Sequence, residues 1–296
     1  MKFGSVINPE NIDFTLPEDH SDTLKILNNS NSDSPLKIHV GCAKWNKADL
    51  KGFYPKGTKD ELKYYSSQFN SIELNATFYR IFSADQFTNW YNKTPTNFKF
   101  FPKIFQDISH WKRLNGVDAV VKDYLYNVAY LKEKLGTIFL QIHNNFSPKH
   151  FDLVSDFIKK WPKEFPLAIE FRHTDWYNNP EISQALYTLL ETHKISNIIV
   201  DTAGRRDIMH MRLTNSSAFI RFVGANHLSD YQRLDNWVLR LKNWKAEGLQ
   251  EINFFIHQNI ELESPLLAAY FINEINKELG SDLKIPNNGN NQISLL

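Results

Sequence analysis

The feature that most constrains this chain is a repeated unit in which a short apolar run is followed by a run of helical periodicity. We count eight such units between Lys37 and Leu279. Strands that alternate with helices in this way require a parallel sheet and right-handed crossovers. Eight units predict a closed barrel, and the lack of a GxGxxG or P-loop pattern leaves the nucleotide-binding open sheets without support.

The expected architecture is an α/β fold, a single (β/α)8 TIM-type barrel with a short irregular N-terminal extension. A barrel of this type needs roughly 250 residues, and the chain has 296. We expect the extension to cover residues 1–35, the barrel residues 36–282, and a C-terminal tail residues 283–296. Residues 28–34, NNSNSDS, have the polar composition of a loop or linker.

Composition limits the classes of function. Hydrophobic residues make up 42% of the chain and charged residues 23%, which is typical of a soluble globular protein. The formal net charge of +1 gives no global basic field that would favour nucleic acid. The single cysteine, Cys42, fits a reducing compartment, and we find no signal peptide or membrane-spanning run. We therefore expect a cytoplasmic protein without a membrane partner; composition does not determine its oligomeric state.

The stretch LAIEFRHTDW, residues 167–176, is the most informative predicted strand. Alternation places Ala168, Glu170 and Arg172 on one face, which in a barrel opens at its C-terminal end into the mouth. We expect His173 and Trp176 to lie in the loop above that opening. In the alternative interpretation, Glu170 and Arg172 are a structural ion pair that fills the barrel.

Other predicted strand ends carry polar residues of the same kind. Catalytic groups in barrels come from these ends and from the loops after them. Charged or imidazole groups from five or more strands at one end favour a ligand site over a purely structural cluster. The residues are Glu73, Asn75, Thr77, Gln141, His143, Asp201, Arg221, His257 and Gln258.

Basic residues near the strand ends indicate the sign of the ligand. A guanidinium fork suits carboxylate or phosphate, so we expect a small anionic molecule, with Arg205 and Arg206 as solvated loop charges in the alternative view. We also expect Arg172 and Arg221 to point inward onto carboxylate or amide partners, because a buried unpaired guanidinium is too costly. The basic set is Lys44, Lys103, Arg172, Arg205, Arg206 and Arg221.

A metal site is the less favoured interpretation. The sequence has no HExxH motif, paired cysteines or other tight ligand spacing, and the cationic side chains nearby oppose a dication. We therefore predict no metal, and the cofactor stays unknown. Residues of suitable type are Glu73, Glu170, Asp201, His143 and His257.

An ordered set of motifs resembles the domain of unknown function 72 family, the YecE-like proteins. The motifs are VGCAKW, GFYPKG, FNSIELNATFY, KFFPKIFQDISH, LGTIFLQIHNNF, IEFRHTDW and IRFVG, between about Ile38 and Leu279. The resemblance implies a TIM-type barrel and no settled activity. The chain departs from the family at CAKW, which places Lys44 where many relatives have none. The family-like positions at the mouth are Glu73, Asn75, Thr77, Tyr79, Lys103, Gln141, Glu170, Arg172, His173 and Trp176.

Three functions follow from these residues. The first is an enzyme, a hydrolase, lyase or isomerase, that acts on a small phosphorylated or sugar-like anion. Its acid or base would be Glu73 or Glu170, with His143 and His257 as alternatives. The second is a protein that binds or cleaves nucleic acid, and the third is a non-catalytic ligand-binding protein. An aromatic groove for the second would use Trp45, Tyr79, Trp111 and Trp176.

Overall fold

A computed structural model describes residues 4–30 and 35–287 of the chain. The predicted linker at residues 28–34 and the predicted tail at residues 283–296 therefore lie partly outside the described residues. Within the described ranges, no helix is both long enough and apolar enough to span a membrane.

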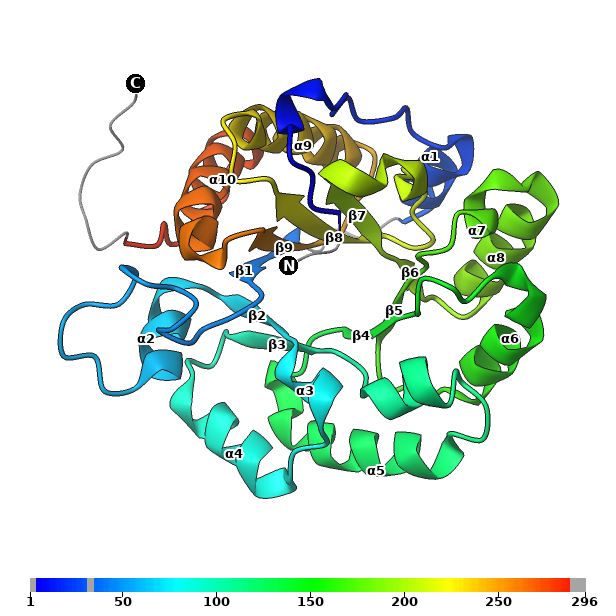
Figure 1. Cartoon of the computed structure of the whole chain (residues 1–296), viewed down its shortest axis with the longest axis horizontal. Coiled ribbons are helices and arrows are strands. Elements are labelled where there is room, and N and C mark those ends of the chain that lie inside the picture. The colour runs from blue at the N-terminus through cyan, green and yellow to red at the C-terminus, as the bar shows by residue number, and fades with distance from the viewer. Residues whose placement is uncertain (1–3, 31–34, 288–296) are drawn as a thin grey trace.

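Parallel strands form the interior of the fold. They lie in three hydrogen-bonded pieces, with strand orders β1-β9-β8-β7, β2-β3 and β4-β5-β6. Within each piece, every pair of neighbouring strands is parallel. Figure 1 shows these strands arranged around a common centre, with the helices outside them. Their bounds are β1 (Lys37–Cys42), β2 (Ser71–Leu74), β3 (Lys99–Pro102), β4 (Ile138–Gln141), β5 (Leu167–Glu170), β6 (Ser196–Asn197), β7 (Ile199–Thr202), β8 (Ser217–Gly224) and β9 (Glu251–Gln258).

The helices begin and end at residues suited to those positions. The Ser83 side chain accepts a hydrogen bond from the backbone of Gln86 at the start of α4, and Asn179 caps α8 in the same way. Gly280 adopts a left-handed conformation at the end of α10. The α-helices are α1 (Ser21–Asn28), α2 (Glu61–Gln68), α3 (Ala76–Tyr79), α4 (Ala84–Lys93), α5 (Asp118–Val128), α6 (Phe151–Lys160), α7 (Asp175–Asn178), α8 (Pro180–Thr192), α9 (Ser229–Ala246) and α10 (Ser264–Leu279).

Short turns of other helix types complete the secondary structure. The 3-10 turns are Pro9–Asn11, Ala129–Lys134, Pro148–His150, Ala203–Ile208 and Glu261–Glu263, and a π-helical turn covers Asp107–Trp111.

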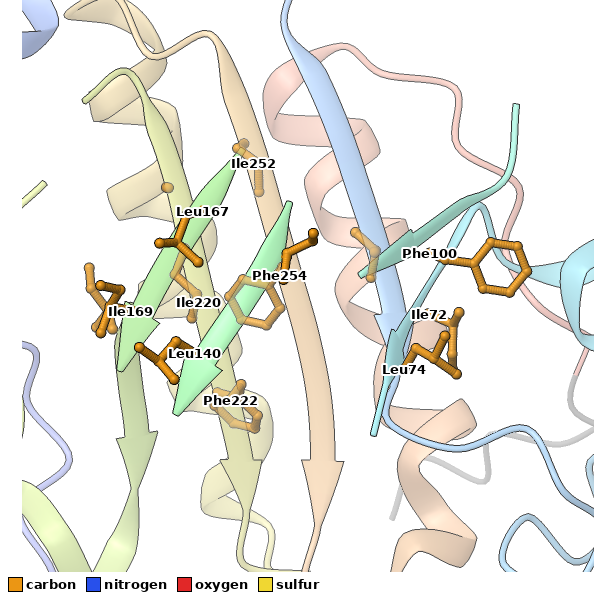
Figure 2. Close-up of a cluster of buried hydrophobic side chains, with 14 of the residues drawn as sticks. Ile72, Leu74, Phe100, Leu140, Leu167, Ile169, Ile220, Phe222, Ile252 and Phe254 are labelled. Atoms are coloured by element: carbon orange, nitrogen blue, oxygen red, sulfur yellow. The ribbon is translucent and has the colours of Figure 1, made fainter. Parts of the chain in front are cut away.

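The outer faces of the strands form the main hydrophobic core. Side chains such as Leu140, Ile169 and Phe254 point outward, and helices cover them (Figures 1 and 2). Trp237 of α9 and Phe271 of α10 belong to the same buried cluster. Alternation along each strand therefore assigns one face to packing under helices, as the sequence predicts for Leu167, Ile169 and Phe171.

The inner faces form a second, separate apolar layer. Aromatic rings from different sheet pieces meet in it: the ring centroid of Phe101 on β3 lies 4.8 Å from that of Phe255 on β9 and 5.9 Å from that of Phe219 on β8. We call this cluster the inner apolar layer; it consists of Phe101, Phe139, Ala168, Ile198, Val200, Phe219 and Phe255.

Side chains and close backbone approaches join the sheet pieces where the strand ladder is interrupted. Between β1 and β2, Asn70 accepts a hydrogen bond from Val40 N (3.0 Å) and donates one to Ile38 O (2.7 Å). A Cβ on Gly41 would lie 2.2 Å from Ser71 O, so only glycine permits this approach. Between β3 and β4, Ile104 N donates to Phe139 O at 2.9 Å.

The described part of the N-terminal extension contacts the other elements. Gly204 N donates to Gly4 O at 2.8 Å, and Thr23 Oγ1 donates to Met211 O at 2.9 Å. Arg240 of α9 forms an ion pair with Asp19 at 2.6 Å. The extension is therefore bound against the β7 and α9 side of the molecule.

Several predicted elements end elsewhere in the structure. The predicted strand over residues 167–176 ends at Glu170, the last residue of β5, and Asp175 begins α7. Alternation predicts one strand over NSIELNATFY, residues 70–79, but β2 ends at Leu74 because the chain turns into α3 after Asn75.

The apolar spacing of residues 117–135 predicts a single helix, but this segment divides after Val128, where α5 is followed by a 3-10 turn that contains Lys132 at a φ of 50°. In the sequence, period-two alternation continues beyond Leu74, where β2 ends, and helical periodicity continues beyond Val128, where α5 ends. The pattern alone therefore predicts elements that are too long.

The Asn70 bridge generates a stability prediction. Replacing Asn70 with Ala removes the partner of two backbone groups of β1, the N–H of Val40 and the carbonyl of Ile38. The free energy of unfolding should therefore fall by about 1–3 kcal/mol. Urea unfolding measures the change. Asn97→Ala, at an exposed position in the turn before β3, is the control and should be close to neutral. Equal effects of the two substitutions would contradict the bridge.

Candidate functional site

A polar layer lies directly above the inner apolar layer. In each of five strands, the residue two positions beyond an inner apolar side chain is polar, so alternation places it on the same inner face. The C-terminal end of the sheet, which we call the mouth, is therefore polar. The pairs are Phe101 and Lys103, Phe139 and Gln141, Ala168 and Glu170, Phe219 and Arg221, and Phe255 and His257.

Arg221 is at the centre of the polar layer. Its Nε and Nη2 each donate to Glu73 at 2.8 Å, and its Nη1 donates to Glu170. The guanidinium lies 5.5 Å from the ring centroid of Phe139. All three charged side chains are buried, which confirms the prediction that Arg221 has carboxylate partners.

Glu170 connects this centre to the mouth. Arg172 Nε donates to it, and Gln141 Nε2 lies 3.1 Å from each of its carboxylate oxygens. The other end of the Gln141 amide accepts a hydrogen bond of 2.7 Å from Lys103 Nζ. A continuous chain of hydrogen bonds thus runs from Arg221 to Lys103.

Glu73 has a second group of partners. Asn75 Nδ2 donates to it at 2.7 Å, and His257 Nε2 lies 3.1 Å from its Oε2. The Nδ1 atom of His257 lies 3.7 Å from Glu261. His257 is therefore between two carboxylates.

These contacts shift the pKa values of the buried acids. Burial acts to raise the pKa of Glu170, but Arg172 and Arg221 together lower it to about 2. Burial also acts to raise the pKa of Glu73. The neighbouring Arg221 and His257 outweigh it and hold this pKa well below the usual range. For His257 burial lowers the pKa, and the neighbouring Glu73 and Glu261 outweigh it, so the net shift is upward. Both glutamates are ionised, and their contacts suit charge partners better than proton carriers.

Two cavities open above the polar layer, and Phe78, Tyr79 and Lys103 line both of them. The first mouth cavity, about 560 Å³, is lined by Ala43, Lys44, Trp45, Asn46, Asp49, Glu73, Leu74, Asn75, Ala76, Phe78, Tyr79, Lys103, His257 and Glu261. The second mouth cavity, about 450 Å³, is lined by Phe78, Tyr79, Lys103, Gln106, His110, Trp111, Gln141, His143 and Arg172.

The second mouth cavity is cationic and carries neutral bases. Burial, together with Arg221 and Arg172, lowers the pKa of Lys103 to about 7. Burial and nearby Lys103 lower the pKa of His110 to about 4, so this imidazole is neutral at pH 7. The rings of His110 and His143 are in edge contact, with centroids 5.1 Å apart. No carboxylate lines this cavity among the residues described.

A larger cavity of about 790 Å³ lies elsewhere, between α5 and α6. None of the residues that the sequence predicts for the site lines it. Size alone therefore does not identify the functional site, and the convergence of polar groups favours the mouth.

Most of the predicted site residues come together at the mouth. Those that line one of its two cavities are Lys44, Trp45, Glu73, Asn75, Tyr79, Lys103, Gln141, His143, Arg172 and His257. Glu170 and Arg221 lie beneath them in the polar layer.

Trp176 and Asp201 lie away from the mouth. Trp176 belongs to the outer core, where its Nε1 donates to Phe146 O at 2.8 Å. Asp201 follows the inner residue Val200 by one position, so it lies on the outer face and accepts hydrogen bonds from Trp237 (2.8 Å) and Arg233 (2.9 Å). The prediction that both side chains lie at the mouth is therefore wrong: Trp176 lies in α7, beyond the end of β5 at Glu170, and Asp201 lies on the outer face of β7.

The other predicted residues hold the local chain in place. Thr77 Oγ1 donates to Lys103 O at 2.7 Å, and His173 lies 3.6 Å from Asp175. Arg205 forms an ion pair with Asp207 at 2.8 Å and also donates to the backbone of Arg172. Arg206 forms an ion pair with Asp201.

Sequence reasoning missed Phe78, His110 and Glu261 at the mouth. His110 lies in the π-helical turn after β3, and Glu261 lies in the turn after β9. Both follow the C-terminal end of a strand, which is the signal that could have found them. In the described part of the chain, no three His, Cys, Asp or Glu residues form a group that could hold a metal ion.

Comparison with known proteins identifies the family. Residues 39–289 match the family model described as "Protein of unknown function DUF72". The chain belongs to the DUF72 family. The UPF0759 protein YecE of Escherichia coli (strain K12) is 25% identical over 274 residues, which cover 84% of this chain and 97% of YecE. The UPF0759 protein YunF of Bacillus subtilis (strain 168) is 29% identical over 164 residues, which cover 50% of this chain and 55% of YunF.

Solved structures of DUF72 proteins share the fold. A crystal structure from Enterococcus faecalis V583 superposes with a TM-score of 0.66 at 20% identity, covering 83% of this chain and 99% of that one. A crystal structure from Thermotoga maritima MSB8 gives a TM-score of 0.65 at 25% identity, covering 83% of this chain and all of the other. The DUF72 fold therefore accounts for most of the described chain.

The buried glutamates generate a pH prediction. Because the folded-state pKa of Glu170 is about 2, its ionised form adds stability above an ordinary glutamate pKa of about 4.3 that is lost as the pH falls towards 2. The shift corresponds to about 3 kcal/mol. Urea unfolding at a series of pH values should show a shallower acid loss for Glu170→Gln than for wild type. Glu164→Gln, at an exposed position, should keep the wild-type slope, and a wild-type slope in Glu170→Gln would refute the assignment.

Proposed function

We propose that this DUF72 protein is an enzyme that acts on a small anionic substrate, phosphorylated or sugar-like, at the mouth. The observation that carries the proposal is the second mouth cavity, where Lys103, Arg172 and two imidazoles line one space above a buried ion-pair network. A pocket with convergent polar groups and shifted pKa values is the usual form of an active site.

The proposal includes a closed fold. Counting β6 and β7 as one strand interrupted at Ile198, the nine labelled strands become eight. We propose that these strands form a single TIM-type barrel whose mouth lies at their C-terminal ends. The side-chain bridge at Asn70 and the contacts of Arg221 support this arrangement.

Charge supports an anionic substrate. The Arg172 side chain retains 12% exposure at the cavity wall, while its Nε contacts the fully buried Glu170. A guanidinium held in place from below offers a fixed group for a carboxylate or phosphate above. The buried carboxylates offset part of the cationic charge without reaching the second cavity.

The catalytic groups that suit this site best are the imidazoles. His143, a predicted catalytic residue, and His110 line the second mouth cavity, where imidazole nitrogens can accept and return protons. Glu73 and His257 line the first mouth cavity. Within the proposal, Glu73 and Glu170 position Arg221 and Arg172, and His257 is a second candidate for proton transfer.

Exposed aromatic rings support a second candidate function, the binding of single-stranded nucleic acid. Tyr79 is 69% exposed and Trp111 is 65% exposed, and both line the cationic cavity. Such rings can stack on bases or on sugars. The formal net charge of +1 gives this candidate less support than the small-anion proposal.

Binding experiments test the proposal. Calorimetric titration with inorganic phosphate and with glycerol phosphate should detect binding to wild type. Arg172→Met should weaken it about tenfold or more, because one charge-assisted contact is lost.

Arg240→Met is the matched control, since it removes the same charge from α9, where Arg240 forms an ion pair with Asp19. It should bind like wild type. Equal affinity for all three proteins, or no binding, would contradict an anion site at the mouth. Tighter binding of a single-stranded oligonucleotide than of either phosphate would favour the second candidate.

A further inference from the structure

We propose that Lys103 is a nucleophile that forms a Schiff base with the carbonyl carbon of a small anionic aldehyde or 2-oxo acid in the second mouth cavity. This inference rests on the proposed function and names the substrate class and the covalent step. It departs from the expectation that Lys103 only holds the anion.

The position of Lys103 suits a nucleophile. It follows the last residue of β3 and lines both mouth cavities, with 8% of the residue exposed. Its backbone oxygen accepts hydrogen bonds from Thr77 Oγ1 (2.7 Å) and Tyr124 OH (3.1 Å), which fix the main chain. Its Nζ donates to Gln141 and lies 4.2 Å from the ring centroid of Phe78. The amine is thus held at one place beside open space.

Its surroundings favour the neutral amine, which is the reactive form. Burial and the guanidinium groups of Arg221 and Arg172 lower the pKa of Lys103 to about 7. At pH 7 about half of such an amine is neutral, roughly a thousandfold more than for an ordinary lysine with a pKa near 10.4. This is the physical route by which lysines become nucleophiles.

Burial alone does not distinguish Lys103 from other lysines. Lys134 is also buried and its pKa is also lowered, but its Nζ donates to the carbonyls of Tyr91 (2.6 Å) and Thr94 (2.7 Å). It lines neither mouth cavity. Lys103 differs because it combines burial with an adjoining cavity that also contains a guanidinium and imidazoles.

The same cavity defines the substrate class. Arg172 suits a carboxylate or phosphate, while Lys103 requires an electrophilic carbonyl carbon within reach. A compound with both groups on a small skeleton meets the two requirements. The imidazoles of His110 and His143 are available to move protons between the amine and the carbonyl oxygen.

The step balances without an oxidant or reductant. The neutral Nζ attacks the carbonyl carbon, so a C–N bond forms and the carbonyl π electrons move to oxygen. An imidazole accepts a proton from nitrogen and returns it to oxygen, giving a carbinolamine. That hydroxyl takes one more proton, which solvent supplies, the nitrogen lone pair forms the C=N bond as the C–O bond breaks, and water leaves the protonated Schiff base.

Reductive trapping tests the proposal. Wild-type protein is treated at pH 7 with glyoxylate, the smallest anionic aldehyde, and sodium cyanoborohydride, whose hydride reduces the imine to stable carboxymethyl-lysine. Peptide mass spectrometry gives the rate at each lysine. Lys103 should react at least about tenfold faster than Lys134 or the exposed Lys242. Propionaldehyde, a neutral aldehyde, should show a smaller preference for Lys103.

Variants separate chemistry from folding. Lys103→Met and Lys103→Arg should both lose the fast reaction, and Lys103→Arg keeps the positive charge if Lys103→Met proves unstable. Lys242→Met should react at Lys103 like wild type.

Two outcomes would overturn the proposal. If wild type binds inorganic phosphate but Lys103 reacts no faster than Lys242, the Schiff base is refuted and the proposed anion site stands. If propionaldehyde labels Lys103 as selectively as glyoxylate does, the anionic substrate class is refuted. A failure of phosphate to bind wild type would instead count against the proposed function.

Discussion

The ion pairs of Arg221 with Glu73 and Glu170 are the interaction on which the rest of the site depends. The three residues come from β8, β2 and β5, which lie in three different hydrogen-bonded pieces of the sheet. Each charge is buried, so each would be costly without the others. One guanidinium therefore links sheet pieces whose strand ladders are interrupted, and it does so directly above the inner apolar layer.

This centre determines what the mouth can do. Glu170 accepts a hydrogen bond from Arg172, which lies nearer the cavity. Through Gln141 it also orients Lys103. Burial, together with the guanidinium groups of Arg221 and Arg172, lowers the pKa of Lys103 to about 7, although Glu170 and Glu73 act to raise it. The surroundings of Lys103 therefore favour the neutral amine. A structural ion-pair network and a ligand site are thus compatible: Arg221 and Glu170 lie beneath the cavities, while Lys103 and Arg172 line the second mouth cavity.

Period-two alternation predicted much of this arrangement and also explains where prediction failed. It placed Glu170 on the inner face, and the expectation that Arg221 points inward is also confirmed, because both residues lie within strands. Asp201 was misplaced because the neighbouring residue, Val200, is the one that faces inward. Successive residues of a strand point to opposite faces, so Asp201 points outward towards Trp237. His110 was missed because it lies in a π-helical turn. The spacing of residues in such a turn does not tell which way a side chain points. The ladder interruptions depend on contacts between distant segments, which local patterns do not contain.

A crystal structure grown with phosphate would test the central claim most directly, that a fixed buried network supports an anion site at the mouth. The account predicts phosphate in the second mouth cavity, in contact with Arg172 and Lys103, while Arg221 still contacts both Glu73 and Glu170. An empty mouth at saturating phosphate, or a phosphate that displaces a glutamate from Arg221, would contradict it.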